Sequence, residues 1–272
     1  MVSGGRLAAI LAPAALLSVF AMPAAADQRD DFIAGRTVNC PGCDLHEAQL
    51  KRRDLTGANL AGADLTFATL HAATLRGADL TGAKLADANL NLADLRNAKL
   101  AGADMSRVLA YGANLTAANL AKAQMQEAKL QTADLTNANL TGVDLRVADM
   151  RLARASNANF SDATLGYVRG DYLHATGANF KGANLYGALF PSAEFGHSDF
   201  TGASLALVNL LKADLTDTTL VNVDFRRASL LRATVTDAQV DQGLWDNTTL
   251  PDGTIYPPPG QTPPPTAAGG QQ

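Results

Sequence analysis

The sequence predicts an all-β solenoid, a quadrilateral β-helix with a short helical cap at its N-terminal end. Three observations lead to this prediction. Large hydrophobic residues recur every five positions from residue 45 to residue 255 without a change of phase. Alanine usually stands two positions before each large residue, and glycine often stands two positions after it. A fixed period over most of a chain is typical of solenoids.

The period of five excludes the regular secondary structures. We call each residue number divisible by five a slot; 39 of the 43 slots from 45 to 255 hold Leu, Phe, Met, Val, Ile or Trp, and 30 of the positions two residues earlier are Ala. An α-helix would scatter such residues around its surface, and a strand would place them on alternating faces. A chain that turns a quarter-circle every five residues keeps all slots inside, so four units make one coil. The glycines lie where a turn with positive φ selects them.

The repeated phrases ANLAGADL (58–65), ADLTNANL (133–140) and ANFKGANL (178–185) fit the pattern A(D/N)Lxx. In these phrases the chain resembles the pentapeptide-repeat family, over about four-fifths of its length. The resemblance implies a right-handed quadrilateral β-helix of about ten coils over residues 44–256. With about 4.8 Å between coils, the rod is expected to be about 50 Å long.

Residues 1–26 are typical of a secretory signal peptide. Arg6 precedes the apolar run Leu7–Phe20, and Ala24, Ala25 and Ala26 precede Asp27. The run is shorter than the ~20 residues of a membrane-spanning helix. We therefore expect a periplasmic or secreted protein, with no stable membrane insertion after cleavage; an uncleaved anchor is the alternative. Residues 257–272 contain six prolines and are expected to be a disordered or polyproline II tail.

Both ends of the solenoid need covers, because open coils expose unpaired backbone and apolar surface. Residues 27–43 are the predicted N-terminal cap, with a short helix over 30–36 that contains Phe32 and Ile33. At the other end we expect Trp245, Leu250 and Ile255 to cover the last coil, with the turn LPDGT at 250–254.

The pattern is irregular in residues 166–177. Gly170 and Ala175 are too small for their slots, whereas Val168 and Leu173 are large at the usual alanine positions. Either the register slips locally so that Val168 and Leu173 fill the core, or the segment bulges outward. The slip is favoured because the period resumes in the same phase afterwards.

Cys40 and Cys43 flank Pro41-Gly42 where the cap meets the first repeat. A redox-active pair would need a helix N-terminus, and a metal site with His46 would lack a fourth ligand. A structural disulfide suits an exported chain. The resemblance implies the same, since exported family members carry similar cysteine pairs ahead of their repeats.

The remaining composition argues against an enzyme, a cofactor and a metal. A net charge of −4 excludes a basic nucleic-acid binder. The sequence contains no nucleophile motif, phosphate loop or dinucleotide fingerprint, and His71, His174 and His197 lack ligand spacing. Aspartates recur before the slots, which indicates a surface and turn role, because an active site needs one distinct constellation.

One face of the predicted coil, that of slots 50, 70, 90 and onward, differs from the others because large apolar residues gather at its outward positions. Its members are Leu92, Leu109, Tyr111, Leu152, Tyr172, Leu189, Leu211 and Leu231, and the adjoining edge adds Phe67, Val147, Tyr167 and Leu207. So long an apolar stripe is rare on a monomer without a partner. We expect it to bind another protein or a second copy of the chain. Alternatively, Leu152 and Tyr172 turn inward beside weak slots and the others are isolated; a bulge at 166–175 would also split the stripe.

The expected function is therefore a non-enzymatic, exported scaffold or protein-interaction module. The resemblance implies an alternative, because some family members mimic DNA and act on DNA gyrase. That role needs a strongly negative face, whereas Lys84, Lys99 and Arg96 interrupt the acidic columns. A carbohydrate-binding or enzymatic β-helix is a third hypothesis, for which Tyr167, Asp171 and Tyr172 form the only, slight cluster.

Overall fold

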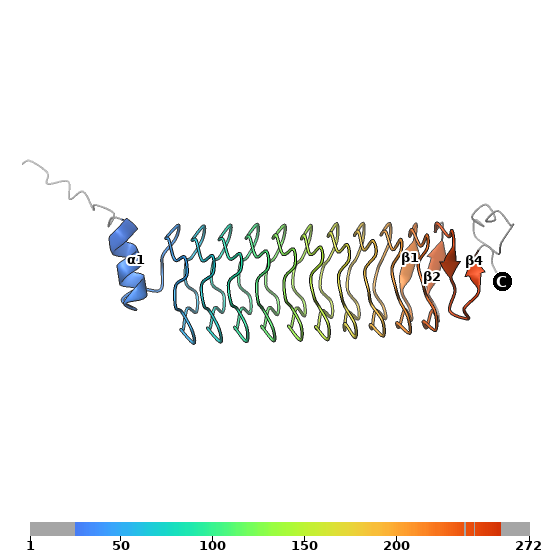
Figure 1. Cartoon of the computed structure of the whole chain (residues 1–272), viewed down its shortest axis with the longest axis horizontal. Helices are drawn as coiled ribbons and strands as arrows, with labels where there is room; N and C mark the ends of the chain where they lie inside the picture. Colours follow the sequence, from blue (N-terminus) through green and yellow to red (C-terminus); the bar gives the residue numbers. More distant parts are fainter. Residues whose placement is uncertain (1–24, 237, 242, 257–272) are drawn as a thin grey trace, which may run out of the picture.

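The computed structural model describes residues 25–236, 238–241 and 243–256, and these form a straight stack of four-sided coils (Figure 1). Each outward residue before a slot forms a parallel β-bridge with the residue 20 positions later, from Asp44 with Asp64 to Ser229 with Thr249. The period of 20 confirms the predicted coil of four five-residue units. The chain is therefore a β-helix in which successive coils, rather than long strands, supply the ladder.

Every corner of the coil is a tight turn. The amide N–H of Ala58 donates to the carbonyl oxygen of Leu55 at 3.0 Å, and Gly57 between them has a φ of 65°. Only the third residue of the turn has positive φ, which is the geometry of a type II turn. The amide of Leu55 then donates to Thr74 in the next coil at 2.7 Å. Turns and ladder together satisfy the main-chain polar groups inside the solenoid.

The interior is filled by the slots and by the small residues two positions before them. Leu55, Ala58 and Leu60 have no exposed surface, and the pattern continues along the rod. In the second half the filling changes from leucine to aromatic rings. Phe160, Phe180 and Phe200 lie in consecutive coils with ring centroids 4.9 and 4.7 Å apart and nearly parallel planes.

The register of residues 166–177 does not slip and the segment does not bulge, so those two predictions are wrong, whereas the prediction that Val168 and Leu173 fill the core is confirmed. The ladder continues at intervals of 20, with Arg154 paired to His174 and His174 to Glu194. Val168 and Leu173 are buried at the usual alanine positions without a change of register. They compensate for the small slot at Gly170, where a Cβ atom would come within 2.5 Å of the Phe190 ring of the next coil. The large side chains at the alanine positions fill the space that the small slot residues leave, so the backbone stays regular.

Helix α1 (Ala25–Ile33) precedes the first coil; it begins and ends earlier than the predicted 30–36 segment. Phe32 is buried, whereas Ile33 is exposed. Arg53 holds helix α1 against the first coil. It stands at a position that is usually alanine, and its long side chain reaches the helix. Its guanidinium lies 4.5 Å from the Phe32 ring centroid and donates hydrogen bonds to the carbonyl oxygens of Phe32 and Ile33. Arg29 of α1 donates in turn to the carbonyl oxygen of Asp44 at 2.8 Å.

Among the described residues, four short strands lie at the C-terminal end, of which Figure 1 labels β1, β2 and β4. β1 (Thr219–Val221) and β2 (Gln239–Asp241) are parallel, and β3 (Thr248–Thr249) and β4 (Ile255–Tyr256) form an antiparallel hairpin. The turn predicted at 250–254 is present, since the amide of Leu250 donates to Thr254 at 2.8 Å. The Trp245 ring stacks on Phe225 at 4.4 Å between centroids. Ile255, also predicted to cover the last coil, exposes 47% of its surface.

The predicted signal peptide falls almost wholly outside the described residues, and the predicted proline-rich tail (257–272) falls outside them completely. Helix α1 begins at Ala25, so the predicted cleavage after Ala26 lies in its first turn. Among the described residues, no helix has the length and apolar character needed to cross a membrane.

Candidate protein-interaction face

The apolar residues predicted for one face do lie on the outside. We call the exposed set, namely Leu92, Leu109, Tyr111, Val147, Leu152, Tyr167, Tyr172, Leu189, Leu207 and Phe67, the apolar stripe; each member exposes 40% or more of its surface. Leu152 and Tyr172, at 52% and 56%, do not turn inward. Because residues 166–177 keep the register, the stripe is not split. Leu211 and Leu231 of the predicted face are only partly exposed.

Seven members of the stripe stand at turn positions with left-handed backbone. Their φ values lie between 58° and 62°, at Phe67, Leu92, Val147, Leu152, Tyr167, Tyr172 and Leu207. This conformation costs a non-glycine residue about 1–2 kcal/mol, most for a β-branched side chain such as Val147. Exposed apolar surface gains nothing from burial in the isolated chain. Neither the backbone nor the monomer core therefore accounts for these residues.

Two turns of the stripe lack the hydrogen bond by which a side chain normally satisfies a turn amide, and other residues make up for it. On the polar faces an Asp or Asn before the slot accepts a hydrogen bond from the N–H two residues later, as Asp54 does from Thr56 at 3.0 Å. Leu109 and Leu189 have no oxygen for this role. Asn91 of the preceding coil instead accepts from the Tyr111 amide at 2.8 Å, and Pro191, which follows Leu189, has no amide proton to satisfy.

Two glycines let large stripe residues lie against the rod. A Cβ atom on Gly112 would lie 2.9 Å from Leu92 Cδ2, and one on Gly187 would lie 2.7 Å from Tyr167 Cε1. Each glycine stands 20 residues after the residue that covers it. The Tyr167 ring also meets Tyr186 edge-on at 5.7 Å between centroids. Sequence reasoning did not include Tyr186, although its place 20 residues after Gly166 sets it beside Tyr167.

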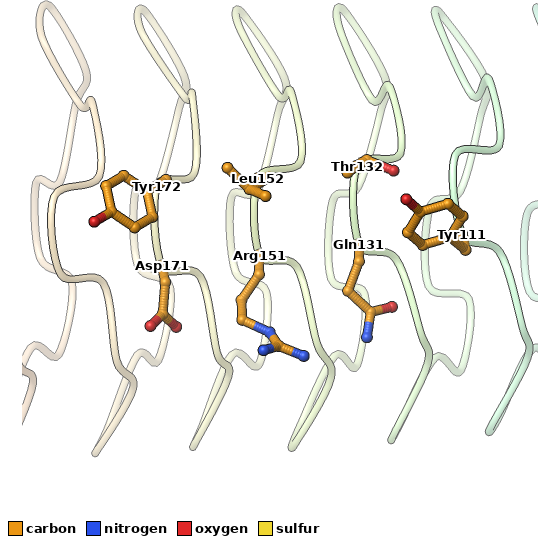
Figure 2. Close-up of a pocket in the computed structure, with 7 residues that line it drawn as sticks. All are labelled: Tyr111, Gln131, Thr132, Arg151, Leu152, Asp171 and Tyr172. Carbon is orange, nitrogen blue, oxygen red and sulfur yellow. The ribbon is translucent and has the colours of Figure 1, made fainter.

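The centre of the stripe contains a pocket of about 340 Å³ (Figure 2). The residues that line it come from the same two turn positions of four consecutive coils; they are Tyr111, Gln131, Thr132, Arg151, Leu152, Asp171 and Tyr172. Figure 2 shows Tyr172, Leu152 and Thr132 in one row and Asp171, Arg151 and Gln131 in a second row beside it. The pocket therefore has an apolar side and a charged side. Gln131, Thr132 and Arg151 were not predicted, although each lies 20 or 40 residues from a predicted member.

The charged side of the pocket is built around Asp149. Its carboxylate accepts hydrogen bonds from Arg151 Nε at 2.8 Å and from Gln131 Nε2 at 2.8 Å. Burial would raise the pKa of Asp149, but the hydrogen bonds from Arg151 and the charges of Arg151 and Arg169 lower it overall. Asp171 follows one coil after Arg151. Its Oδ2 atom is buried and finds no hydrogen-bond partner within the part of the chain that the structure describes.

The other sequence candidates form no reactive site. Cys40 and Cys43 are joined in the predicted disulfide, so neither sulfur is free to ligate a metal with His46. Across the described ranges, no three His, Cys, Asp or Glu side chains group in a way that could hold a metal ion. Of the slight cluster considered for carbohydrate binding, Asp171 and Tyr172 share the pocket, whereas Tyr167 lies at the other edge of the stripe.

Several aspartates outside the pocket pair with bases in their own turn or in a neighbouring coil. Lys84 lies 3.3 Å from Asp64, Arg76 contacts Asp94, and Arg107 lies 2.6 Å from Asp87. The hydrogen bond and charge of Arg96 lower the pKa of Asp94 far below its usual value, against the effect of burial. The pairs that join two coils link them, and each pair reduces the negative potential around its own aspartate.

A family model described as pentapeptide repeats matches residues 43–82, 73–109, 110–137, 128–166, 174–206 and 209–242, with eight copies. The chain belongs to the pentapeptide-repeat family. The pattern A(D/N)Lxx, the coil of four units and the inward leucines agree with this membership. It implies the right-handed quadrilateral β-helix that the sequence predicted.

Several solved pentapeptide-repeat structures are similar to the chain. HetL, involved in heterocyst differentiation regulation in the cyanobacterium Nostoc sp. strain PCC 7120, is 28% identical over 84% of this chain and 97% of its own, with a TM-score of 0.44. A protein from the thylakoid lumen of Arabidopsis thaliana is 32% identical over 41% of this chain and 68% of its own, with a TM-score of 0.19. QnrB1, a plasmid-mediated fluoroquinolone resistance protein, is 16% identical over 75% of this chain and 91% of its own, with a TM-score of 0.41. No curated protein matches the chain.

Proposed function

We propose that this pentapeptide-repeat protein is an exported, non-enzymatic interaction module that binds a protein through the apolar stripe. The observation that carries the proposal is the concentration of large, exposed apolar side chains at left-handed turn positions of one face. Surfaces of this kind mark interaction sites on soluble proteins. The pocket between Tyr111 and Tyr172 adds a concave, partly charged centre.

Export is supported by the signal-like N-terminal segment and by the disulfide next to the first repeat, which suits an oxidising compartment. Helix α1 is proposed to cap the first coil. Its contacts with Arg53 and the burial of Phe32 support this role.

The alternative function, a DNA mimic that acts on DNA gyrase, requires one strongly negative face. The pairing of Asp64, Asp87 and Asp94 with lysine or arginine argues against such a face. Export would also separate the chain from a cytoplasmic enzyme. We therefore place interaction through the stripe first.

Photo-crosslinking in living cells tests the proposal. A photoreactive phenylalanine analogue replaces Tyr172 in one variant and Asn157, an exposed turn residue on a polar face, in the matched control. We expect crosslinked protein only from the stripe position, and in the exported fraction of the cells. Equal crosslinking from both positions, or none from position 172, would refute the proposed use of the stripe.

A further inference from the structure

We propose that the occupant of the apolar stripe is a second copy of the chain, packed antiparallel about a twofold axis. This inference rests on the proposed function, because it names the partner of the same surface. The axis passes between the coil of Asp149 and Leu152 and the next coil, that of Arg169 and Tyr172. An axis perpendicular to the rod reverses its direction and leaves each column of outward residues facing the same column of the second copy. Residues 20 positions apart on either side of the axis therefore face one another.

Four charges at the centre of the stripe are arranged for this symmetry. Asp149 and Arg169 are bridge partners in one outward column, and Arg151 and Asp171 follow one another in the neighbouring column of turn residues. Across the axis, Arg151 faces the second copy's Asp171, and this pair occurs twice in the dimer. Arg169 faces the second copy's Asp149, which exposes only 7% of its surface, so the two charges attract without direct contact. Opposite charges in register give an interface specificity and orientation.

The half-buried carboxylate of Asp171 gives a second reason for this pairing. Its Oδ2 atom is buried and finds no hydrogen-bond partner among the described residues of its own chain. The guanidinium of Arg151 already binds Asp149 through Nε and one terminal nitrogen, with the terminal nitrogen 2.6 Å from Asp149 Oδ2. An arginine has further donors, so once the Asp171 side chain turns to expose its buried Oδ2 atom, Arg151 can bind its own Asp149 and the second copy's Asp171 together.

At the centre of the stripe the same axis matches apolar residues with apolar residues, whereas farther out Leu92, Leu189 and Leu207 face the second copy's Arg232, Lys129 and Arg107. Leu152 faces the second copy's Tyr172, and Val147 faces the second copy's Tyr167. All four are exposed by more than half in the single chain. They lie at the two corners that border the charged centre. The result is the arrangement of a stable interface, with aromatic anchors beside a satisfied polar group.

Other registers and the parallel packing are less favourable. A shift of the axis onto the coil of Asp149 sets Asp149 against Asp149 and Arg151 against Arg151, and like charges in contact are unfavourable. A parallel dimer, with the axis along the rod, brings the two corner columns together, so that Asp87 faces Leu92. The antiparallel packing instead sets Asp87 against the second copy's Arg227. Tyr111 and the second copy's Leu211 then face each other on both sides of the charged centre.

Sedimentation velocity of the full chain recovered from cells tests the stoichiometry. We expect a dimer at micromolar concentration, with twice the mass that the processed chain shows under denaturing conditions. Leu152→Lys is expected to raise the dissociation constant about 100-fold, because each substitution counts twice in a symmetric dimer. Ala117→Lys, at the same turn position on the opposite side of the coil, leaves it unchanged. Combining Leu152→Lys with Tyr172→Glu sets an ammonium against a carboxylate across the axis and recovers most of the loss.

Crosslinking tests the antiparallel register. Both native cysteines are in the disulfide, so only introduced thiols react with a short bismaleimide. A mixture of Tyr111→Cys and Leu211→Cys chains is expected to form covalent dimers, whereas each variant alone does not. Dimers from Tyr111→Cys alone would indicate a parallel packing and overturn the inference.

The inference and the proposed function fail in different ways. A chain that stays monomeric at high concentration overturns the inference, whatever it binds in cells. If photo-crosslinking from position 172 then yields a different protein, the proposed function stands with another partner. A monomer that also gives no crosslink refutes both. Circular dichroism of every variant shows whether the β-helix is intact.

Discussion

Two opposite faces of the same coil differ in how far their surface groups are satisfied within the chain. The face of slots 60, 80 and 100 has an asparagine ladder, in which Asn139 donates to Asn119 at 3.2 Å and Asn179 donates to Asn159 at 3.1 Å. Each asparagine also accepts a bond from its own turn, as Asn159 does from Ser161. None of the described residues on that face is a large exposed hydrophobic. Its polar groups are satisfied within the chain, whereas the stripe leaves both apolar surface and a carboxylate oxygen unmatched.

The two faces also differ inside. Behind the asparagine ladder every slot from 60 to 220 is Leu or Phe, and Phe180 stacks between Phe160 and Phe200. Behind the stripe, slots 110 and 170 are Ala and Gly. The polar face therefore has the more regular core. The comparison suggests a division of roles within one coil: the side with the asparagine ladder contributes more to stability, and the side with the stripe is available for interaction.

The largest expected effect comes from the core behind the polar face. Phe180→Ala removes a fully buried ring from the stack and is expected to lower the free energy of unfolding by about 3–5 kcal/mol. Tyr172→Ala, on the stripe of the same coil, removes an exposed ring and is expected to change it by less than about 0.5 kcal/mol at protein concentrations below the dimerisation range, where no contact with a second copy is lost. Urea unfolding of both variants measures the contrast. Similar losses for the two would contradict a division of roles between the faces.

Most of the fold follows from the sequence because one local rule repeats. The Leu at a slot, the Ala before it and the turn after it specify each unit, so the coil and its register were predictable from residue types alone. The outcome at residues 166–177 was not, because it depends on contacts between coils. Gly170 is accommodated by the ring of Phe190, which lies one coil away. Volume balance of this kind is invisible to a rule that reads one unit at a time.

The stripe was predictable for a related reason, and its pocket was not. The coil length of 20 residues assigns Leu92, Tyr111 and Tyr172 to one face by their residue numbers alone. Arg151 and Gln131 are polar, and only their hydrogen bonds to Asp149 make them part of the site. Likewise, the reach of Arg53 to helix α1 depends on the open end of the rod. A periodic pattern therefore does not predict hydrogen-bonded charge networks or the contacts made at the ends of the rod.

A smaller effect is expected from the charged centre of the stripe. Asp149→Asn removes the charge that Arg151 binds and is expected to lower the free energy of unfolding by about 1–3 kcal/mol at neutral pH. Because folding lowers the pKa of Asp149, the carboxylate stabilises the fold above its unfolded pKa of about 3.9 and loses this effect as pH falls further. The gap between wild type and variant should therefore close below about pH 4. Chemical unfolding at several pH values measures it.

Asp199→Asn is the matched control on the opposite face. Asp199 also has a lowered pKa, and it forms a 3.0 Å pair with Lys181, whose side chain is more than half exposed. An exposed pair of this kind contributes about 0.2–1 kcal/mol. A pH dependence as large for Asp199→Asn as for Asp149→Asn would show that the stripe's charged centre has no special part in stability.

The smallest expected effect has the opposite sign and separates stability from interaction. Val147 is a β-branched residue at a φ of 62° and is more than half exposed. Val147→Gly relieves the left-handed strain, and after the added freedom of glycine in the unfolded chain it should stabilise the monomer by about 0.5–1 kcal/mol. The converse change on a polar corner, Gly142→Val, should destabilise the monomer by a similar amount, since the added side chain meets no close contact there.

If the stripe binds a second copy, Val147→Gly also weakens the dimer, because it removes the contact with the second copy's Tyr167. Unfolding below the dimerisation range and sedimentation above it measure the two effects separately, and a more stable, equally dimeric variant would show that Val147 lies outside the interface.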